Sequence, residues 1–353
     1  VIVKAPGLVA PDFTWETVTQ MDFGFDASFL NNRLTGTFDW YRRNTKDMLV
    51  AGATLPATLG ASVPKSNSAD MKTIGWELSL GWNDRLENGF SYWVKGVLSD
   101  YQATITKYAG NDAGFYSQSD DDGKYYVGQK IGEIWGYHSN GLFQSDDEAA
   151  TIDQSELYAG KWGAGDVKYE DLDNDGKITK GEETIYNPGD KSIIGNKTPR
   201  YQFGITVGFD YKNFDFEMFW QGTGKRDYML SGAQFWGFTS QWDVPYTPAL
   251  DYWTETNTDA YFPRPGWQNG GNRVTSDRYL QSAAYGRLKN LTVGYTIPKN
   301  LTTKWGISRL RLYVTGENLL TITPLNDAFD PETLGGMTYP INRKVAIGLN
   351  LTL

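Results

Sequence analysis

The stretch Tyr201-Gln202-Phe203-Gly204-Ile205-Thr206-Val207-Gly208-Phe209-Asp210-Tyr211 decides the fold of this chain. Each odd position carries a large apolar residue, and each even position carries a small or polar one. A period of two is typical of a β-strand whose two faces meet different surroundings. The chain then reverses within two residues, and large apolar residues return at every second position from Phe214 to Trp220. These two segments therefore predict an antiparallel β-hairpin.

The same alternation recurs along the chain and predicts nine strands. They lie near residues 19–29, 34–40, 74–82, 90–98, 201–211, 214–220, 291–295, 310–314 and 345–353. Short turns and long connections alternate between them, and the two longest connections are predicted at residues 109–200 and 222–281. Outer-membrane barrels have short turns at one end and long loops at the other, whereas a soluble β-sandwich has no reason to do so. We therefore interpret residues 1–353 as all-β, an antiparallel transmembrane β-barrel segment with long extracellular loops.

Aromatic residues cluster near the two ends of the predicted strands. If the long loops lie outside, one group falls near the outer boundary of the membrane, namely Trp40 and Trp220. The other group falls near the inner boundary and consists of Phe29, Trp82, Phe90, Tyr211 and Phe214. Such bands are typical of membrane barrels, because amphipathic rings prefer the interface. The alternative is that these rings are core aromatics that happen to lie near strand ends.

Composition excludes several classes of function. The 353 residues carry a net charge of −9, so binding to nucleic acid has no electrostatic support. The chain contains no Cys, which rules out disulfides and thiol chemistry. It also has no run of 18 apolar residues, as a transmembrane helix requires.

An odd number of strands predicts that the barrel is incomplete. Bacterial single-chain barrels have even strand counts, and an open sheet edge cannot face lipid, because its backbone groups find no partners there. We therefore expect this chain to be the C-terminal part of a larger barrel, with the remaining strands elsewhere.

Four stretches of the chain resemble one family of membrane proteins. They are Gly165-Asp166-Val167-Lys168-Tyr169 continuing to Ile178 and on to Ile194–Tyr201, Tyr285–Leu291 with Gly294-Tyr295, Thr315–Leu320, and Tyr339-Pro340 to the end. Together with the strands, they make the whole chain similar to the C-terminal region of SusC/RagA-type TonB-dependent transporters of Bacteroidota.

The resemblance implies a plugged barrel of about 22 strands in the bacterial outer membrane, with the plug domain outside this chain. It implies a SusD-like surface lipoprotein as a lid and TonB as the source of energy. It also implies import of a nutrient, most often an oligosaccharide and in some members a peptide. An enzyme is not expected.

A twelve-residue segment from Asp171 to Glu182 matches the template of a calcium-binding loop. The candidate ligands fall at positions 1, 3, 5, 7, 9 and 12, and Gly176 makes the sharp turn at position 6. They are Asp171, Asp173, Asp175, Lys177 through its carbonyl, Thr179 and Glu182. Oxygen ligands suit a hard cation, so we predict a structural calcium ion that orders a long loop. The alternative is a solvated acidic turn.

A second candidate site is an aromatic cluster in the 222–281 connection. Aromatic faces bind the C–H surfaces of sugars, while amides and carboxylates bind hydroxyl groups. The residues predicted to contact cargo are Phe235, Trp236, Phe238, Gln241, Trp242, Asp243, Trp253 and Trp267. Two alternatives remain open: the rings form the core of the loop itself, or they dock the lid lipoprotein.

The remaining sequence offers no catalytic site. His138 is the only histidine, and one His without Cys cannot build a transition-metal site. No nucleophile or phosphate-loop motif is present. Three rival functions share parts of the pattern: a passive porin, a secreted carbohydrate-binding β-protein, and a structural scaffold without a cargo path.

Overall fold

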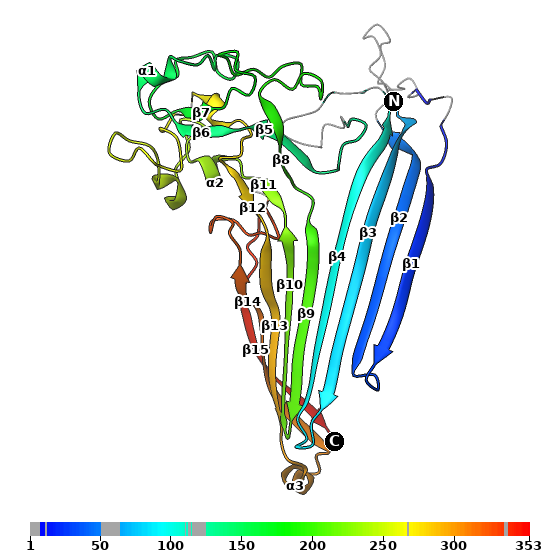
Figure 1. Ribbon diagram of the computed structural model, residues 1–353. Helices are drawn as coiled ribbons and strands as arrows, with labels where there is room; N and C mark the ends of the chain where they lie inside the picture. Colours follow the sequence, from blue (N-terminus) through cyan, green and yellow to red (C-terminus); the bar gives the residue numbers. More distant parts are fainter. Residues whose placement is uncertain are drawn as a thin grey trace, which may run out of the picture.

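The computed structural model describes residues 8–10, 13–50, 64–109, 111, 114, 125–266, 268–334 and 338–353. Nine long strands form one antiparallel sheet in the order β1-β2-β3-β4-β9-β10-β13-β14-β15 (Figure 1). Their bounds are β1 Thr17–Phe29, β2 Leu34–Val50, β3 Ser66–Arg85, β4 Ser91–Tyr108, β9 Arg200–Tyr211, β10 Phe214–Lys225, β13 Tyr285–Thr296, β14 Arg309–Ile322 and β15 Lys344–Thr352. The nine predicted strands are confirmed.

Shorter elements occupy the connections between these strands. Three two-stranded sheets pair β5 Glu133–Tyr137 with β8 Lys191–Asn196, β6 Ser139–Leu142 with β7 Val167–Tyr169, and β11 Asp227–Met229 with β12 Leu280–Ser282. The helices are α1 Asp146–Ala149, α2 Ala233–Trp236, α3 Lys299–Thr302, η3 Thr247–Leu250, η4 Gly270–Arg273 and η5 Thr303–Trp305. Within the described residues, no helix has the length and apolarity needed to cross a bilayer.

The connections at the two ends of the sheet differ in length. At one end, residues 30–33, 86–90, 212–213 and 297–308 link consecutive strands. At the other end, the connections run from β2 to β3, from β4 to β9, from β10 to β13 and from β14 to β15, and Figure 1 shows the described parts of the last three gathered above the sheet. We call these the turn side and the loop side. The predicted alternation of short and long connections is confirmed.

The strand register places the large apolar residues on one face of the sheet. Phe25 pairs with Phe38, Phe38 with Leu78, Leu78 with Leu98, and Leu98 with Phe203, which makes one apolar row across five strands. Directly opposed residues of antiparallel strands point to the same side. We call this side the apolar face, and the opposite side, with Asp39, Glu77 and Ser99, the polar face.

Among the residues that the structure describes, no second layer covers the apolar face. A β-sandwich requires Phe203, Ile205 and Val207 to be packed beneath another sheet, yet Ile205 is exposed and the buried clusters of the described residues contain none of the three. Aromatic residues lie toward both ends of this face. Trp40 pairs with Trp76 toward the loop side, and the Phe214 and Tyr295 rings lie 4.7 Å apart toward the turn side. The structure therefore favours a sheet whose apolar side meets lipid.

The polar face is tied across strands by charged and small residues. Arg311 on β14 donates from Nε to Asp215 on β10 at 2.9 Å, which spans the intervening strand β13. Gly294 is the β13 residue between them, and a Cβ there would lie 2.5 Å from both charged groups. Glycine at this position therefore permits the ion pair to cross one strand.

The sheet has two open edges. Among the described strands, β1 pairs only with β2, and β15 pairs only with β14. The outer backbone groups of these edge strands need partners, because a free edge in lipid leaves them without hydrogen bonds. The described sheet is therefore part of a larger barrel.

Candidate functional site

The long connections on the loop side fold together into one packed unit, which we call the loop module. It consists of described residues from three segments, 133–196, 226–284 and 323–334, and Figure 1 shows it at one end of the sheet. Its buried apolar residues are Tyr137, Leu142, Val167, Tyr169, Ile178, Leu230, Phe235, Trp236, Trp253, Ala260, Phe262, Tyr279, Ala283, Leu325 and Leu334. Three segments far apart in the sequence thus share one core.

Helix α2 carries the centre of this core. The Phe235 side chain is 1% exposed, and its ring centroid lies 5.2 Å from that of Phe262 and 5.0 Å from that of Trp236. Trp236 in turn meets Tyr279 edge to face at 4.6 Å. Rings at such distances contribute beyond their buried area, so these side chains hold the module together.

The segment after α2 exposes apolar side chains to solvent. Trp242 is 83% exposed and Val244 is 78% exposed, and two further apolar residues, Tyr246 and Leu250, are also exposed. We call these four residues the exposed tip. Single exposed apolar residues are ordinary, whereas four within nine positions concentrate exposed apolar surface on one short segment.

The Asp243 carboxylate shapes the turn that presents Trp242. It accepts hydrogen bonds from the Thr239 hydroxyl at 2.6 Å, from the Thr239 backbone N–H at 2.7 Å and from the Ser240 backbone N–H at 2.7 Å. The hydrogen bond from the Thr239 side chain is the largest of the causes that lower the pKa of Asp243. Its acceptor oxygens are thus engaged within the turn, and Asp243 positions Trp242.

The residues predicted to contact cargo differ in burial. Phe235, Trp236 and Trp253 are buried in the core, which is the packing role considered as an alternative from the sequence. Gln241 and Trp242 are exposed, and contact of these two with cargo stays a prediction.

Two of the predicted residues are half-buried, Phe238 and Asp243. Trp267 lies outside the described residues. Val244 and Leu250 could not be predicted as part of this surface, because the sequence does not show whether an apolar side chain in a loop is exposed or buried.

The acidic loop folds around Asp171. One carboxylate oxygen accepts the Asn174 N–H at 2.7 Å and the other accepts the Gly176 N–H at 2.8 Å. Gly176 has φ of 85°, in the left-handed region that favours glycine, so the predicted sharp turn at this position is confirmed. Asn174 also adopts positive φ, at 62°, which Asn tolerates better than most residues.

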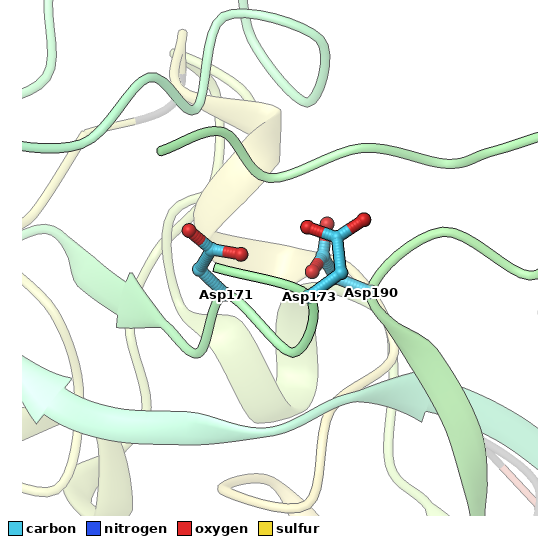
Figure 2. Close-up of side chains that lie close together, drawn as sticks. All are labelled: Asp171, Asp173 and Asp190. Carbon is cyan, nitrogen blue, oxygen red and sulfur yellow. The ribbon is translucent and has the colours of Figure 1, made fainter. Parts of the chain in front are cut away.

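Asp190 completes the acidic cluster, as Figure 2 shows. Carboxylate oxygens of Asp171, Asp173 and Asp190 lie within 4.8 Å of one another. The Asp190 side chain is buried and accepts the backbone N–H of Leu172 and of Thr179, each at 2.7 Å. The chain thus brings a carboxylate from outside the twelve-residue template to the cluster.

The other predicted calcium ligands are placed differently. Glu182 is exposed and is not a member of the described cluster, so its role as a calcium ligand stays a prediction. Asp175 accepts the Lys177 N–H at 2.8 Å and also lies outside the cluster. Thr179 contacts the Asp190 carboxylate through its own N–H. The template located the loop but not the full set of carboxylates.

The electrostatics of this cluster suit a cation. Desolvation raises the pKa of Asp171, but hydrogen bonds from Gly176, Asn174 and other neighbours outweigh it, and the pKa lies below its usual value. Desolvation also raises the pKa of Asp173, repulsion from neighbouring carboxylates adds to it, and here the net shift is upward. A bound cation would relieve this repulsion.

Comparison with known proteins identifies the family of the chain. A family model described as TonB dependent receptor-like, beta-barrel matches residues 4–319. The chain belongs to this family. Membership implies an integral outer-membrane protein, and receptors of this family are transporters rather than enzymes.

Two curated relatives match nearly the whole chain. TonB-dependent receptor P3 of Formosa agariphila is 30% identical over 379 residues, which cover 98% of this chain and 35% of the relative. TonB-dependent receptor SusC of Bacteroides thetaiotaomicron is 26% identical over 344 residues, which cover 96% of this chain and 32% of SusC. The chain spans about a third of the length of these relatives.

A solved structure has the same fold as this part of the receptor. The RagAB peptide transporter superposes with a TM-score of 0.73 at 22% identity, over 97% of this chain and 36% of the matched chain. The likeness supports an all-β segment of a larger TonB-dependent barrel.

His138 ties segments of the receptor's loop module together. Its Nδ1 lies 2.7 Å from Asp277 Oδ2, and its Nε2 lies 2.7 Å from Ser192 Oγ. The order Ser–His–Asp matches a hydrolytic triad. A nucleophilic serine of that kind is exposed on a sharp turn between a strand and a helix. Ser192 instead lies in the β5–β8 ladder, opposite Gly136. These contacts therefore link β8 and the 277 segment to the residue between β5 and β6.

Arg287 anchors the third segment of the module to the receptor sheet. It lies on β13, is buried, and donates from Nη2 to Asp330 at 2.6 Å. Its Nη1 lies 3.0 Å from Glu332, and Glu332 also pairs with Lys289 at 3.1 Å. The motif Tyr285–Leu291 thus has a structural role, because its cations hold the acidic 330–332 segment in place.

Proposed function

We propose that the complete protein imports a nutrient across the bacterial outer membrane with energy from TonB. The observation that carries this proposal is a folded loop module, with an exposed aromatic tip, on one end of a barrel segment of the TonB-dependent receptor family. A folded module on the loop side can select cargo and close over it. A passive porin needs no such structure.

We infer that a SusD-like lipoprotein covers the loop side as a lid. The likeness to SusC and to the RagAB complex supports this partner. The exposed tip of Trp242, Val244, Tyr246 and Leu250 supports it as well, because Trp and Tyr are enriched in the buried centres of protein interfaces. The long connections are then extracellular.

The proposed cargo is an oligosaccharide. Exposed Trp242 beside exposed Gln241 offers an aromatic face and an amide, the combination that recognises sugars. A peptide is the second candidate, because the solved relative RagAB is described as a peptide transporter. Either cargo suits an exposed ring next to hydrogen-bonding groups.

Uptake by living cells tests this function. Cells with the complete protein should accumulate a labelled oligosaccharide mixture or peptide mixture, and removal of TonB should abolish accumulation. Trp242→Ala should lower the affinity for the cargo or for the lid lipoprotein by about tenfold, because Trp residues often contribute most of the binding energy at an interface. Glu255→Gln, an exposed change in the same segment, is the control. Uptake that persists without TonB would exclude the proposal in favour of a porin.

We propose that the acidic loop binds a calcium ion through Asp171, Asp173 and Asp190. Hard cations prefer several carboxylate oxygens, and these three lie close together in a loop that is already folded by its own hydrogen bonds. The ion would supply a fixed positive charge that draws the three carboxylates of residues 171–190 together, while Ile178 of the same segment is buried in the core of the loop module. Its role is structural.

Calcium removal should loosen this loop. We expect the intact receptor to be cleaved faster within residues 171–190 after EDTA treatment, and slower again after calcium is restored. Asp173→Asn should weaken calcium affinity by at least about tenfold, the loss that even outer-shell changes cause at metal sites. Glu255→Gln serves again as the control.

Acidification should also release the ion. The pKa of Asp173 is raised, so this carboxylate takes up a proton at a higher pH than an ordinary Asp and then no longer binds a cation. Affinity for calcium should therefore fall as the pH is lowered toward that pKa.

Equal protease resistance with and without EDTA at neutral pH would rule the calcium site out.

A further inference from the structure

The apolar face ends abruptly toward the loop side of β2. Phe38 and Trp40 lie on this face, and the next residues on the same face are Arg42, Asn44 and Lys46. Their partners on β1 change in the same way, from Phe25 and Phe23 to Met21 and then to two threonines. A change from apolar to polar residues across several strands marks the boundary of the lipid-facing band.

Three cations gather just beyond this boundary. Asn44 pairs with Lys72 of β3, while Arg42 and Lys46 are the same-face neighbours of Asn44 along β2. Residues two apart on a strand are about 7 Å apart, and directly opposed residues are closer. Asn44 accepts a hydrogen bond from Arg42 Nε at 3.3 Å. We call Arg42, Lys46 and Lys72 the basic cluster.

The charges of the basic cluster are not neutralised by acids of the described chain. None of its three residues forms an ion pair with a described carboxylate. The neighbouring Asp70 carboxylate accepts the backbone N–H of Asp47 at 3.0 Å. Arg42 and Lys46 are exposed, and Lys72 is half-buried. The cluster therefore presents about three positive charges just beyond the end of the apolar face.

On the neighbouring strands β4 and β9, the charged residues at the same boundary are paired with each other. Asp100 of β4, which pairs with Trp76, forms a bidentate ion pair with Arg200 of β9. There the cation is neutralised within the sheet. Unpaired positive charge at this boundary is thus found on β2 and β3 but not at the Asp100–Arg200 pair of β4 and β9.

We propose that the basic cluster binds the phosphate of a lipid headgroup in the leaflet on the loop side. The aliphatic stems of Lys and Arg can lie along Trp40 and Ile74 while their charged ends reach the headgroup layer. Clusters of basic residues at a membrane surface attract anionic headgroups, and the attraction weakens with salt. The inference rests on the membrane-spanning part of the proposed function, and not on the cargo or the lid.

Binding of a phosphorylated lipid to the intact receptor tests this inference. The probe is diphosphorylated lipid A, added to the detergent-purified receptor and followed by native mass spectrometry. The triple variant R42Q/K46Q/K72Q should bind it about 100-fold more weakly at low ionic strength, from roughly a factor of five for each cation. The matched control R85Q/K299Q/K304Q removes one Arg and two Lys at the turn side and should bind like the unchanged protein.

The other arms separate the sources of the effect. Lipid A without phosphate should bind the unchanged receptor as weakly as lipid A binds the triple variant. Phosphatidylglycerol should show the same loss in the triple variant as lipid A if any lipid phosphate suffices. Equal lipid A affinity of the triple variant and the control would overturn the inference, and so would full binding of the phosphate-free lipid.

Folding and function are checked separately. Heat-modifiable migration on gels reports whether the triple variant is a folded barrel, and the charge-conserving R42K/K46R/K72R variant should retain lipid A affinity within about threefold because the charge is kept. Failure of that variant to bind would also count against a phosphate contact. If the unchanged receptor bound lipid A as expected but did not take up cargo, the proposed import would be refuted and the lipid site would stand.

Discussion

Replacing Phe235 with Ala should destabilise the loop module by about 3–5 kcal/mol, the range observed when a buried Phe is truncated. The ring is almost fully buried. It packs against Phe262 and Tyr279 of its own 226–284 segment and against Phe329 of the 323–334 segment. The cavity left by the change would thus weaken contacts between the 226–284 and 323–334 segments. The rings that contact Phe235 all belong to the loop module, so the sheet should keep its own stability.

Hydrogen exchange of the intact receptor measures this effect. Amides of β6, β7 and β12 should exchange faster by a factor of 100 or more, which follows from a loss of about 3 kcal/mol, while amides of β9 and β10 should not change. Trp242→Ala is the matched control, since it also removes a ring from the same segment but at a site that is 83% exposed. Unchanged protection in Phe235→Ala would contradict the assignment of this core.

Replacing Arg287 with Ala should release the 323–334 segment from β13. Breaking a buried ion pair by removing one partner costs about 3–5 kcal/mol, because the other charge stays behind. We expect the lower end of this range, since Asp330 is partly exposed and water can reach it. Limited proteolysis should then cut within residues 323–334, and exchange of the amides near Leu325 should accelerate.

Lys344→Ala provides the control for Arg287→Ala. Lys344 pairs with Glu317 at 3.6 Å, and both side chains are exposed. Such surface pairs contribute about 0–1 kcal/mol, so the control should leave the 323–334 segment protected. If both variants were equally resistant to protease, the Arg287 network would not be the anchor.

The strands could be predicted because their pattern is local. In Tyr201–Tyr211, each apolar residue faces one side, and the observed strand covers Arg200–Tyr211. Strand β2 was predicted only to residue 40 but continues to Val50. Beyond Trp40, the positions on the apolar side of the strand carry Arg42 and Asn44. The alternation of apolar and polar residues therefore ends there, while the strand pairing continues.

The candidate sites could be predicted only in part. Asp171, Asp173 and Gly176 follow from a local template, and the structure shows them in one turn. Asp190 could not be predicted, because it reaches the cluster through a loop that closes by its own hydrogen bonds to Leu172 and Thr179.

The aromatic residues show the same limit. Phe235 and Trp242 lie seven positions apart in a segment rich in rings, yet one is buried and the other is exposed. Burial depends on what packs against a ring, and Phe235 meets Phe329 from a distant segment. Residue type alone could not separate a core ring from a binding ring.

The sequence by itself determined the nine strands, their two unlike faces and the alternation of short and long connections, because side-chain alternation and turn residues act over a few neighbouring positions. The tertiary structure alone decided which rings are buried, which third carboxylate joins the acidic loop and which strands bring three cations to neighbouring positions beyond the apolar face. These features arise from contacts between segments that are far apart in the chain, and no local pattern encodes such contacts.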